Sequence, residues 1–73
     1  MSVPVNERLL LTLLDAAAYL SIGQTLFKEY VAAGDIRPLR VGIRGVRFRR
    51  SDCEALADRI EKGETTLQRK ASV

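Results

Sequence analysis

The chain contains 73 residues, of which 47% are hydrophobic and 29% are charged, and its formal net charge at pH 7 is +3. This length provides one small domain with little volume for an enclosed catalytic pocket, and the hydrophobic content argues against intrinsic disorder. No apolar run approaches the roughly 18 residues that a membrane span needs. Because Cys53 is the single cysteine, the chain has no disulfide framework, which is typical of the cytoplasm. We therefore expect a soluble, cytoplasmic protein.

The residue types present give little support for catalysis or metal binding. The sequence has no histidine, which removes the commonest general base and the commonest metal ligand. One cysteine without histidine cannot form a structural zinc site. Cys53 falls on the apolar stripe of a predicted helix, so we interpret it as a core residue rather than a nucleophile. We expect a protein that is not an enzyme and needs neither a cofactor nor a metal ion.

The positive charge is concentrated in one short segment. Residues 37–50 contain six of the 12 basic residues and none of the nine acidic residues, whereas the segments on either side each carry a slight excess of acid. A merely solvated hairpin would normally mix Glu, Lys and Thr rather than exclude acids throughout. A basic patch of this kind is the electrostatic signature of a polyanionic partner.

The first half of the chain predicts an arm and two short helices. Residues 1–10 lack periodicity and are interpreted as an arm. Thr12, with Asp15 three residues later, is expected to cap a helix over residues 13–20. The apolar positions of this helix lie on one face: Leu13, Leu14, Ala17 and Leu20.

A turn at residues 21–23 separates this helix from a second one, predicted over residues 24–33 and ended by Gly34. Three side chains of the second helix form its inward stripe: Phe27, Tyr30 and Val31. Three others are left on the outer face near its N-terminal end: Gln24, Thr25 and Lys28. Such side chains can donate hydrogen bonds to base edges or phosphates.

After Gly34 the apolar period changes from 3.6 to 2, which predicts a β-hairpin with strands in residues 37–42 and 46–49. Two glycines, Gly42 and Gly45, suit the tight turn between them. The side chains expected to face the core are Leu39, Val41, Val46 and Phe48. The arginines expected to form a solvent-facing side of the hairpin are Arg40, Arg44, Arg47 and Arg49.

A third helix is predicted from a capping box formed by Ser51 and Glu54, and it should end near Gly63. Its apolar stripe comprises Cys53, Leu56, Ala57 and Ile60. Residues 64–73 are polar and are expected to form a flexible tail. The predicted fold is therefore α+β: an arm at 1–10, a winged helix-turn-helix domain at 11–63 (helix-turn-helix, two-stranded wing, C-terminal helix), and a tail at 64–73.

The sequence resembles the excisionase and MerR-like winged helix-turn-helix family of small DNA-binding proteins. The similarity covers residues 11–60. Its most specific parts are the run Ala-Gly-Asp-Ile-Arg-Pro-Leu-Arg-Val-Gly at 33–42 and the run Val-Arg-Phe-Arg-Arg-Ser-Asp at 46–52. The other matching residues are Leu11, Thr12, Ala16, Ala17, Ala18, Tyr19, Leu20, Ile22, Phe27, Tyr30, Val31 and Leu56.

The resemblance implies sites for double-stranded DNA on the second helix and on the wing. It assigns the major-groove role to Gln24, Thr25 and Lys28. It assigns the phosphate and minor-groove role to Arg44 and Arg47 at the wing tip, with Arg40 and Arg49 flanking them. We expect cooperative self-association on DNA and no membrane partner.

The resemblance further implies a phage or mobile-element excisionase, which binds and bends attachment-site DNA and directs an integrase toward excision. A small MerR-like transcriptional regulator with the same DNA-binding head is the first alternative. A protein-binding, antitoxin-like module whose residues 64–73 fold on contact with a partner is another. RNA binding is a weaker alternative, because Tyr30 and Phe48 are expected to point inward rather than to stack on bases.

Overall fold

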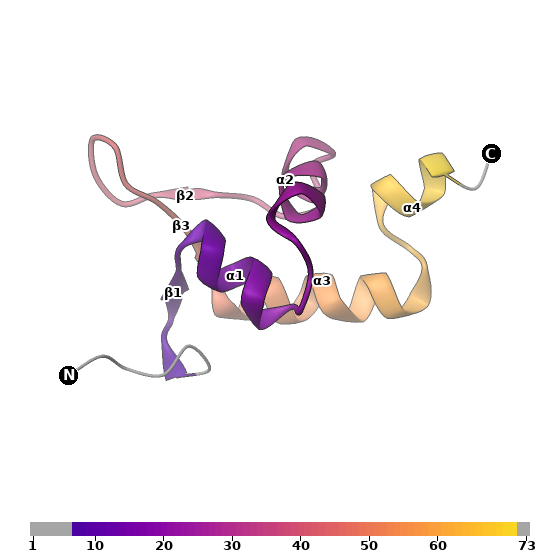
Figure 1. The fold of residues 1–73 in the computed structure, drawn as a ribbon, viewed down its shortest axis with the longest axis horizontal. Helices are drawn as coiled ribbons and strands as arrows, with labels where there is room; N and C mark the ends of the chain where they lie inside the picture. Colours follow the sequence, from indigo (N-terminus) through magenta and orange to yellow (C-terminus); the bar gives the residue numbers. More distant parts are fainter. Residues whose placement is uncertain (1–6, 72–73) are drawn as a thin grey trace.

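The structure, a computed structural model, describes residues 7–71 (Figure 1). Its elements follow in the order β1 (Leu10–Leu11), α1 (Leu13–Tyr19), α2 (Gln24–Ala32), β2 (Leu39–Arg40), β3 (Val46–Arg49), α3 (Arg50–Lys62) and α4 (Thr66–Ala71). Within the described residues the fold is a small α+β arrangement of four helices and one three-stranded antiparallel sheet. The predicted fold class is confirmed at this level.

The sheet has one strand more than the sequence analysis predicts. Its strand order is β1-β3-β2, and both pairings are antiparallel, with Leu11 opposite Phe48. The prediction of an arm over residues 1–10 is therefore wrong for residue 10, where β1 begins. Residues 1–6 of the predicted arm lie outside the described residues. β1 is held in place because Leu11 is 1% exposed and belongs to the core.

Two aromatic rings join the helices to the sheet. Phe27 of α2 and Phe48 of β3 meet edge to face, with ring centroids 4.9 Å apart, and both side chains are fully buried. Such a pair adds about 0.5–1.5 kcal/mol to the stabilisation from burial itself. The core residues are Leu11, Ala16, Ala17, Phe27, Tyr30, Ile36, Phe48, Cys53 and Leu56.

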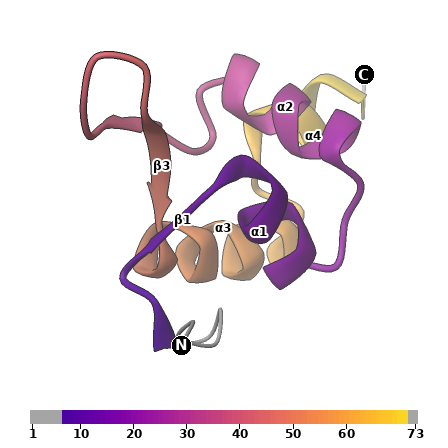
Figure 2. The same cartoon turned by 60° about the vertical axis from the view of Figure 1, so that its left-hand side comes forward.

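The apolar faces of the predicted elements are corrected at four positions. Leu14 and Ala57 are exposed, since the buried residues of α1 are Ala16 and Ala17 and those of α3 are Cys53 and Leu56. Val41 and Val46 are also exposed, since the outer part of the β2–β3 hairpin projects beyond the helices, as Figure 2 shows.

Local capping signals explain where α1 begins and where α2 and α3 end. Thr12 Oγ1 accepts a hydrogen bond from the Asp15 amide at 3.1 Å, which confirms the predicted cap of α1. Gly34 follows the last turn of α2 with φ 83°, a left-handed conformation that glycine adopts without a steric penalty. Gly63 ends α3 in the same way, with φ 68°.

The capping box predicted for the third helix does not form. The chain passes directly from β3 into α3, whose first residue is Arg50, so Ser51 already lies inside the helix. Arg49 occupies the cap position without a side-chain hydrogen bond. The Arg50 amide instead donates to the Leu9 carbonyl at 2.9 Å, so pairing with the chain around β1 replaces the side-chain cap.

Residues 66–71 form α4, so the flexible tail expected over residues 64–73 is wrong for this part; residues 72 and 73 lie outside the described residues. Thr65 is fully buried and forms a capping box with Gln68. Thr65 Oγ1 accepts from the Gln68 amide at 3.1 Å, and Gln68 Oε1 accepts from the Thr65 amide at 3.3 Å. α4 packs against α2 (Figure 2). None of the helices described over residues 7–71 is long and apolar enough to cross a lipid bilayer.

Candidate nucleic-acid interface

The predicted site residues lie on two separate parts of the molecule, the start of α2 and the β2–β3 hairpin. In both views these parts stand on the same side of the layer formed by α1 and α3 (Figures 1 and 2). The hairpin loop projects freely, whereas α2 rests on the core. The fold therefore brings the two predicted groups of residues to one side of the protein.

The side chains predicted on the outer face of α2 are all exposed: Gln24, Thr25 and Lys28. Phe27 and Tyr30 are buried on the opposite face and set the rotation of the helix about its axis. Gly23 occupies the N-cap position of α2 and has no side chain with which to cap the first turn. The N-terminal turns of α2 therefore present the polar side chains of Gln24, Thr25 and Lys28, together with the apolar side chain of Leu26, which is 37% exposed.

The four predicted arginines of the hairpin are confirmed as accessible, to different degrees. Arg40, Arg44 and Arg49 are exposed, and Arg47 is half-buried. Arg47 Nη1 donates to the Val46 carbonyl at 2.9 Å, which leaves the other guanidinium N–H groups available. Within residues 7–71, none of the four arginines forms an ion pair with a carboxylate. The hairpin consequently carries positive charge that no described carboxylate neutralises.

The strand register corrects the prediction that one face of the hairpin carries all the arginines. Leu39 is opposite Arg47, and Arg40 is opposite Val46. Residues directly opposite in an antiparallel pair share a face, and side chains alternate along each strand. Arg40 therefore lies on the face of Val46, whereas Arg47 lies on the other face. Arginines border both faces of the hairpin, a distribution that the alternation of residues within each strand could not reveal.

Two exposed residues of the same segment are missing from the predicted site. Arg37, between Ile36 and the start of β2, is exposed and makes no ion pair with any described residue. Ile43 in the hairpin loop is 95% exposed, the highest value among the large hydrophobic side chains of the described chain. The signal for Ile43 is present in the sequence, because an apolar residue stands between Gly42 and Arg44 in a predicted turn.

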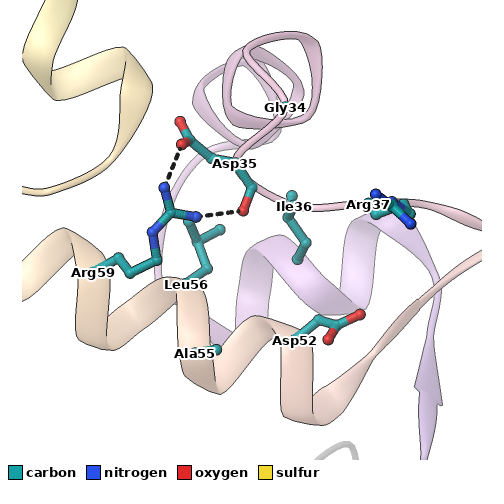
Figure 3. A pocket seen from close by; sticks show the side chains of 8 residues that line it. All are labelled: Gly34, Asp35, Ile36, Arg37, Asp52, Ala55, Leu56 and Arg59. Carbon is teal, nitrogen blue, oxygen red and sulfur yellow. Dashed lines mark hydrogen bonds and ion pairs between the residues drawn. The ribbon is translucent and has the colours of Figure 1, made fainter.

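A surface pocket of about 340 Å³ lies between the loop after α2 and the helix α3, and Figure 3 shows the side chains that line it. Arg59 of α3 reaches across to Asp35, whose side chain is fully buried. Asp35 also accepts hydrogen bonds from the amides of Thr66 and Leu67, at 2.7 and 3.1 Å. The carboxylate thus joins three segments of the chain, and its contacts give this pocket a structural role.

The ionisation of Asp35 follows from these contacts. Burial alone raises the pKa of the carboxyl group, but the hydrogen bonds from Thr66 and Leu67 and the positive charge of Arg59 lower it further than burial raises it. The net pKa is below the usual 3.8. Asp35 is therefore a stable anion at neutral pH.

Cys53 is fully buried, which confirms its assignment to the core. Burial, together with the negative charges of Asp52 and Glu54, raises the pKa of its thiol to about 11. A thiol with such a pKa stays protonated at neutral pH and is a poor nucleophile. In the part of the chain that the structure describes, no three potential metal-ligating side chains (His, Cys, Asp or Glu) lie together.

Comparisons with known proteins return no match: no protein-family model fits the chain, and no curated protein is significantly similar to it.

Proposed function

We propose that the protein binds double-stranded DNA as a winged helix-turn-helix protein. In this proposal α2 enters the major groove, and the β2–β3 hairpin is the wing that contacts the adjacent minor groove. The observation that carries the proposal is the set of hairpin arginines that have no carboxylate partner within residues 7–71, on the same side of the fold as the exposed α2.

The first support is the shape and chemistry of α2. A major groove about 12 Å wide admits one α-helix, and base edges there are read by short polar side chains and by cations. Gln24 and Thr25 can both donate and accept hydrogen bonds. Lys28 lies one turn further along the same exposed face and is placed to contact a phosphate.

The second support is the charge of the hairpin. Arginine matches phosphate as a bidentate fork, and it is attracted to the negative potential of a narrow minor groove. Because Arg40 and Arg47 border opposite faces, the hairpin can approach both phosphate backbones that wall a groove. A solvated hairpin without a partner would gain nothing from this excess of like charge.

Within this function we infer the role of an excisionase of a phage or mobile element, on the resemblance of residues 33–42 and 46–52 to that family. The protein would then bind and bend attachment-site DNA, cooperatively with further copies of itself, and direct an integrase toward excision. A small transcriptional regulator is the alternative. An integrase-dependent excision assay on attachment-site DNA, with and without the protein, separates these two roles.

The antitoxin-like alternative is weakened by α4. That reading requires residues 64–73 to fold only on contact with a partner, whereas residues 66–71 are helical in the isolated chain. The amides that begin α4 bond to Asp35 of the same chain. The tail thus has an intramolecular partner already.

The test of DNA binding is a fluorescence-anisotropy titration of labelled duplexes at several salt concentrations. Each phosphate contact contributes a slope of about 0.9 to the dependence of log K on log salt. Four arginines and Lys28 predict a slope of about −4.5 for the wild-type protein. If no duplex is bound at protein concentrations up to about 100 μM, the weak limit of non-specific DNA binding, the proposal is wrong.

A further inference from the structure

The tip of the β2–β3 hairpin combines an exposed apolar side chain with a narrow backbone. The Val41 amide donates to the Gly45 carbonyl at 3.0 Å, which closes a loop of three residues, 42–44. Ile43 in this loop is 95% exposed. A branched hydrocarbon side chain at such a position is fully hydrated in the free protein and gains most from contact with an apolar surface.

The glycines on either side of the tip keep it thin. A Cβ atom at Gly45 would lie 2.9 Å from Cγ2 of Val41, so the close approach of the two strands depends on glycine at this position. Gly42 also carries no side chain, so Ile43 and Arg44 are the two side chains that the three-residue loop presents. The loop therefore offers one apolar and one cationic side chain, without further bulk from its glycines, to a groove about 6 Å wide.

Apolar and cationic side chains gather around Ile43. A small surface hollow beside the loop is lined by Arg40, Ile43, Arg44, Gly45 and Val46. Val41 and Val46 are about half exposed and extend the apolar surface from the tip toward the base of the hairpin. The hairpin end consequently presents hydrocarbon at its centre and arginine at its edges.

Resting on the proposed function, we infer that Ile43 is an apolar wedge that enters the minor groove and partly unstacks one base step, thereby bending the duplex. Arginines on both faces of the hairpin would neutralise the two phosphate backbones, while the side chain between them contacts sugars and base faces. Proteins that kink DNA from the minor groove insert side chains of this type, isoleucine included. Pyrimidine–purine steps such as TA and CA are the easiest to unstack and are the expected sites of insertion.

Charge favours DNA over a second copy of this chain as the partner of Ile43. The apolar pocket beside β1, lined by Leu9, Leu10 and residues 49–51, is the surface on which a neighbouring hairpin tip could dock. Arg49 and Arg50 line that pocket, so docking would bring them against Arg44 and Arg40 of the neighbour. Like charges in contact oppose this association, whereas the phosphates of a minor groove attract the same arginines.

The experiment uses duplexes selected from a random DNA library by the wild-type full-length protein. A 2-aminopurine placed in a pyrimidine–purine step reports unstacking, and energy transfer between labelled duplex ends reports bending. The variants are Ile43→Ala, which removes the wedge, and Ile43→Leu, which keeps its volume. Leu14→Ala is the control, because Leu14 is an exposed apolar side chain of α1 outside the proposed interface.

We expect Ile43→Ala to abolish the 2-aminopurine signal and most of the bend, and to weaken binding about 10-fold, with the salt dependence unchanged. Ile43→Leu and Leu14→Ala should behave like the wild type. All four proteins should give the same circular dichroism, since neither side chain is buried.

Three results would overturn the inference. The first is unstacking and bending by Ile43→Ala equal to those of the wild type. The second is a defect of Ile43→Ala confined to cooperative binding of a second molecule, which would assign Ile43 to contact between copies. The third is tight, salt-dependent binding by the wild type without any unstacking, which would leave the proposed DNA binding intact and remove the wedge alone. Failure of the wild type to bind any duplex would overturn both proposals.

Discussion

Arg59 holds Asp35 through both terminal nitrogens of its guanidinium group. Nη2 donates to Oδ1 of the Asp35 carboxylate at 2.9 Å, and Nη1 donates to the Asp35 backbone carbonyl at 3.0 Å (Figure 3). The Asp35 side chain is completely buried, whereas 41% of the Arg59 side chain is exposed. Because Asp35 also accepts from the first amides of α4, one carboxylate connects the loop after α2 to both α3 and α4.

Replacing Asp35 should destabilise the whole domain. Asp35→Ala removes the hydrogen-bond partner of two backbone amides, those of Thr66 and Leu67, and of the Arg59 guanidinium. We expect the free energy of unfolding to fall by about 2–4 kcal/mol, less than for a fully buried ion pair because Arg59 can turn to water. Urea unfolding followed by circular dichroism measures this loss. Asp58→Ala, at an exposed carboxylate of α3, is the control; a loss equal to that of the control would contradict the role of Asp35.

The same contacts predict loss of stability in acid. The pKa of Asp35 is lower in the folded protein than its usual 3.8, so the unfolded chain binds this proton more readily. The stabilisation is therefore complete above the unfolded pKa and is lost as the pH falls through the folded pKa. Urea unfolding from about pH 5 to about pH 2 should show the wild type converging on Asp35→Ala. A constant difference between the two proteins over this range would disprove the assignment.

The thiol of Cys53 should be inert in the native protein. Its side chain is fully buried, and its pKa is raised to about 11, so alkylation requires local or global opening. We expect the rate of reaction with iodoacetamide to be far below that of a free thiol and to rise with urea as the protein unfolds. Ser51→Cys in a Cys53→Ala background supplies an exposed comparison on the same helix. Equal rates for the two proteins without urea would show that Cys53 is accessible.

The arginines of the hairpin should determine the salt dependence of DNA binding. Arg44→Ala combined with Arg47→Ala removes two proposed phosphate contacts, so the slope of log K against log salt should become shallower by about 2. Binding should weaken on all sequences alike, as measured by anisotropy on selected and random duplexes. The matched control removes two lysines elsewhere, Lys62→Ala with Lys70→Ala. An unchanged slope in the arginine variant would remove Arg44 and Arg47 from the interface.

The exposed face of α2 should determine the choice of sequence. Gln24→Ala or Thr25→Ala removes proposed contacts with base edges, and each should reduce discrimination between selected and random DNA by about 1–3 kcal/mol. Binding to random DNA should stay the same. Lys28→Ala is the contrasting variant, since loss of a phosphate contact changes the salt slope by about 1 and leaves discrimination intact. If Gln24→Ala and Thr25→Ala both discriminated between selected and random DNA as well as the wild type does, these side chains of α2 would be excluded from base recognition.

Several structural features could be predicted because their signals are local. The cap at Thr12, the left-handed glycines at positions 34 and 63, and the inward stripe of α2 each depend on residues within one or two turns. The capping box of Thr65 and Gln68 is equally local, with the pattern Thr-x-x-Gln, although the polar composition of residues 64–73 predicts a flexible tail. The concentration of arginine in residues 37–50 is likewise a property of the sequence alone.

Other features depend on partners distant in the chain. Nothing near Leu10 indicates that it pairs with Arg49, or that this pairing lets α3 begin without a side-chain cap. The local alternation of the hairpin placed Arg40 with Arg47, whereas the register between the two strands places them on opposite faces. A shift of one residue between strands reverses every face, and only packing of both strands decides that shift.

The amino-acid sequence by itself therefore determined the three helices and the hairpin of residues 13–63, the cap of α1, the glycine ends of α2 and α3, the buried cysteine and the charge of the hairpin, because caps, periodicity and composition act over a few residues. The tertiary structure alone decided the third strand, the faces on which the arginines lie and the use of Asp35 to hold α4. These features depend on which segments meet across the core, where one buried side chain such as Phe48 or Asp35 contacts several residues that are distant in the sequence.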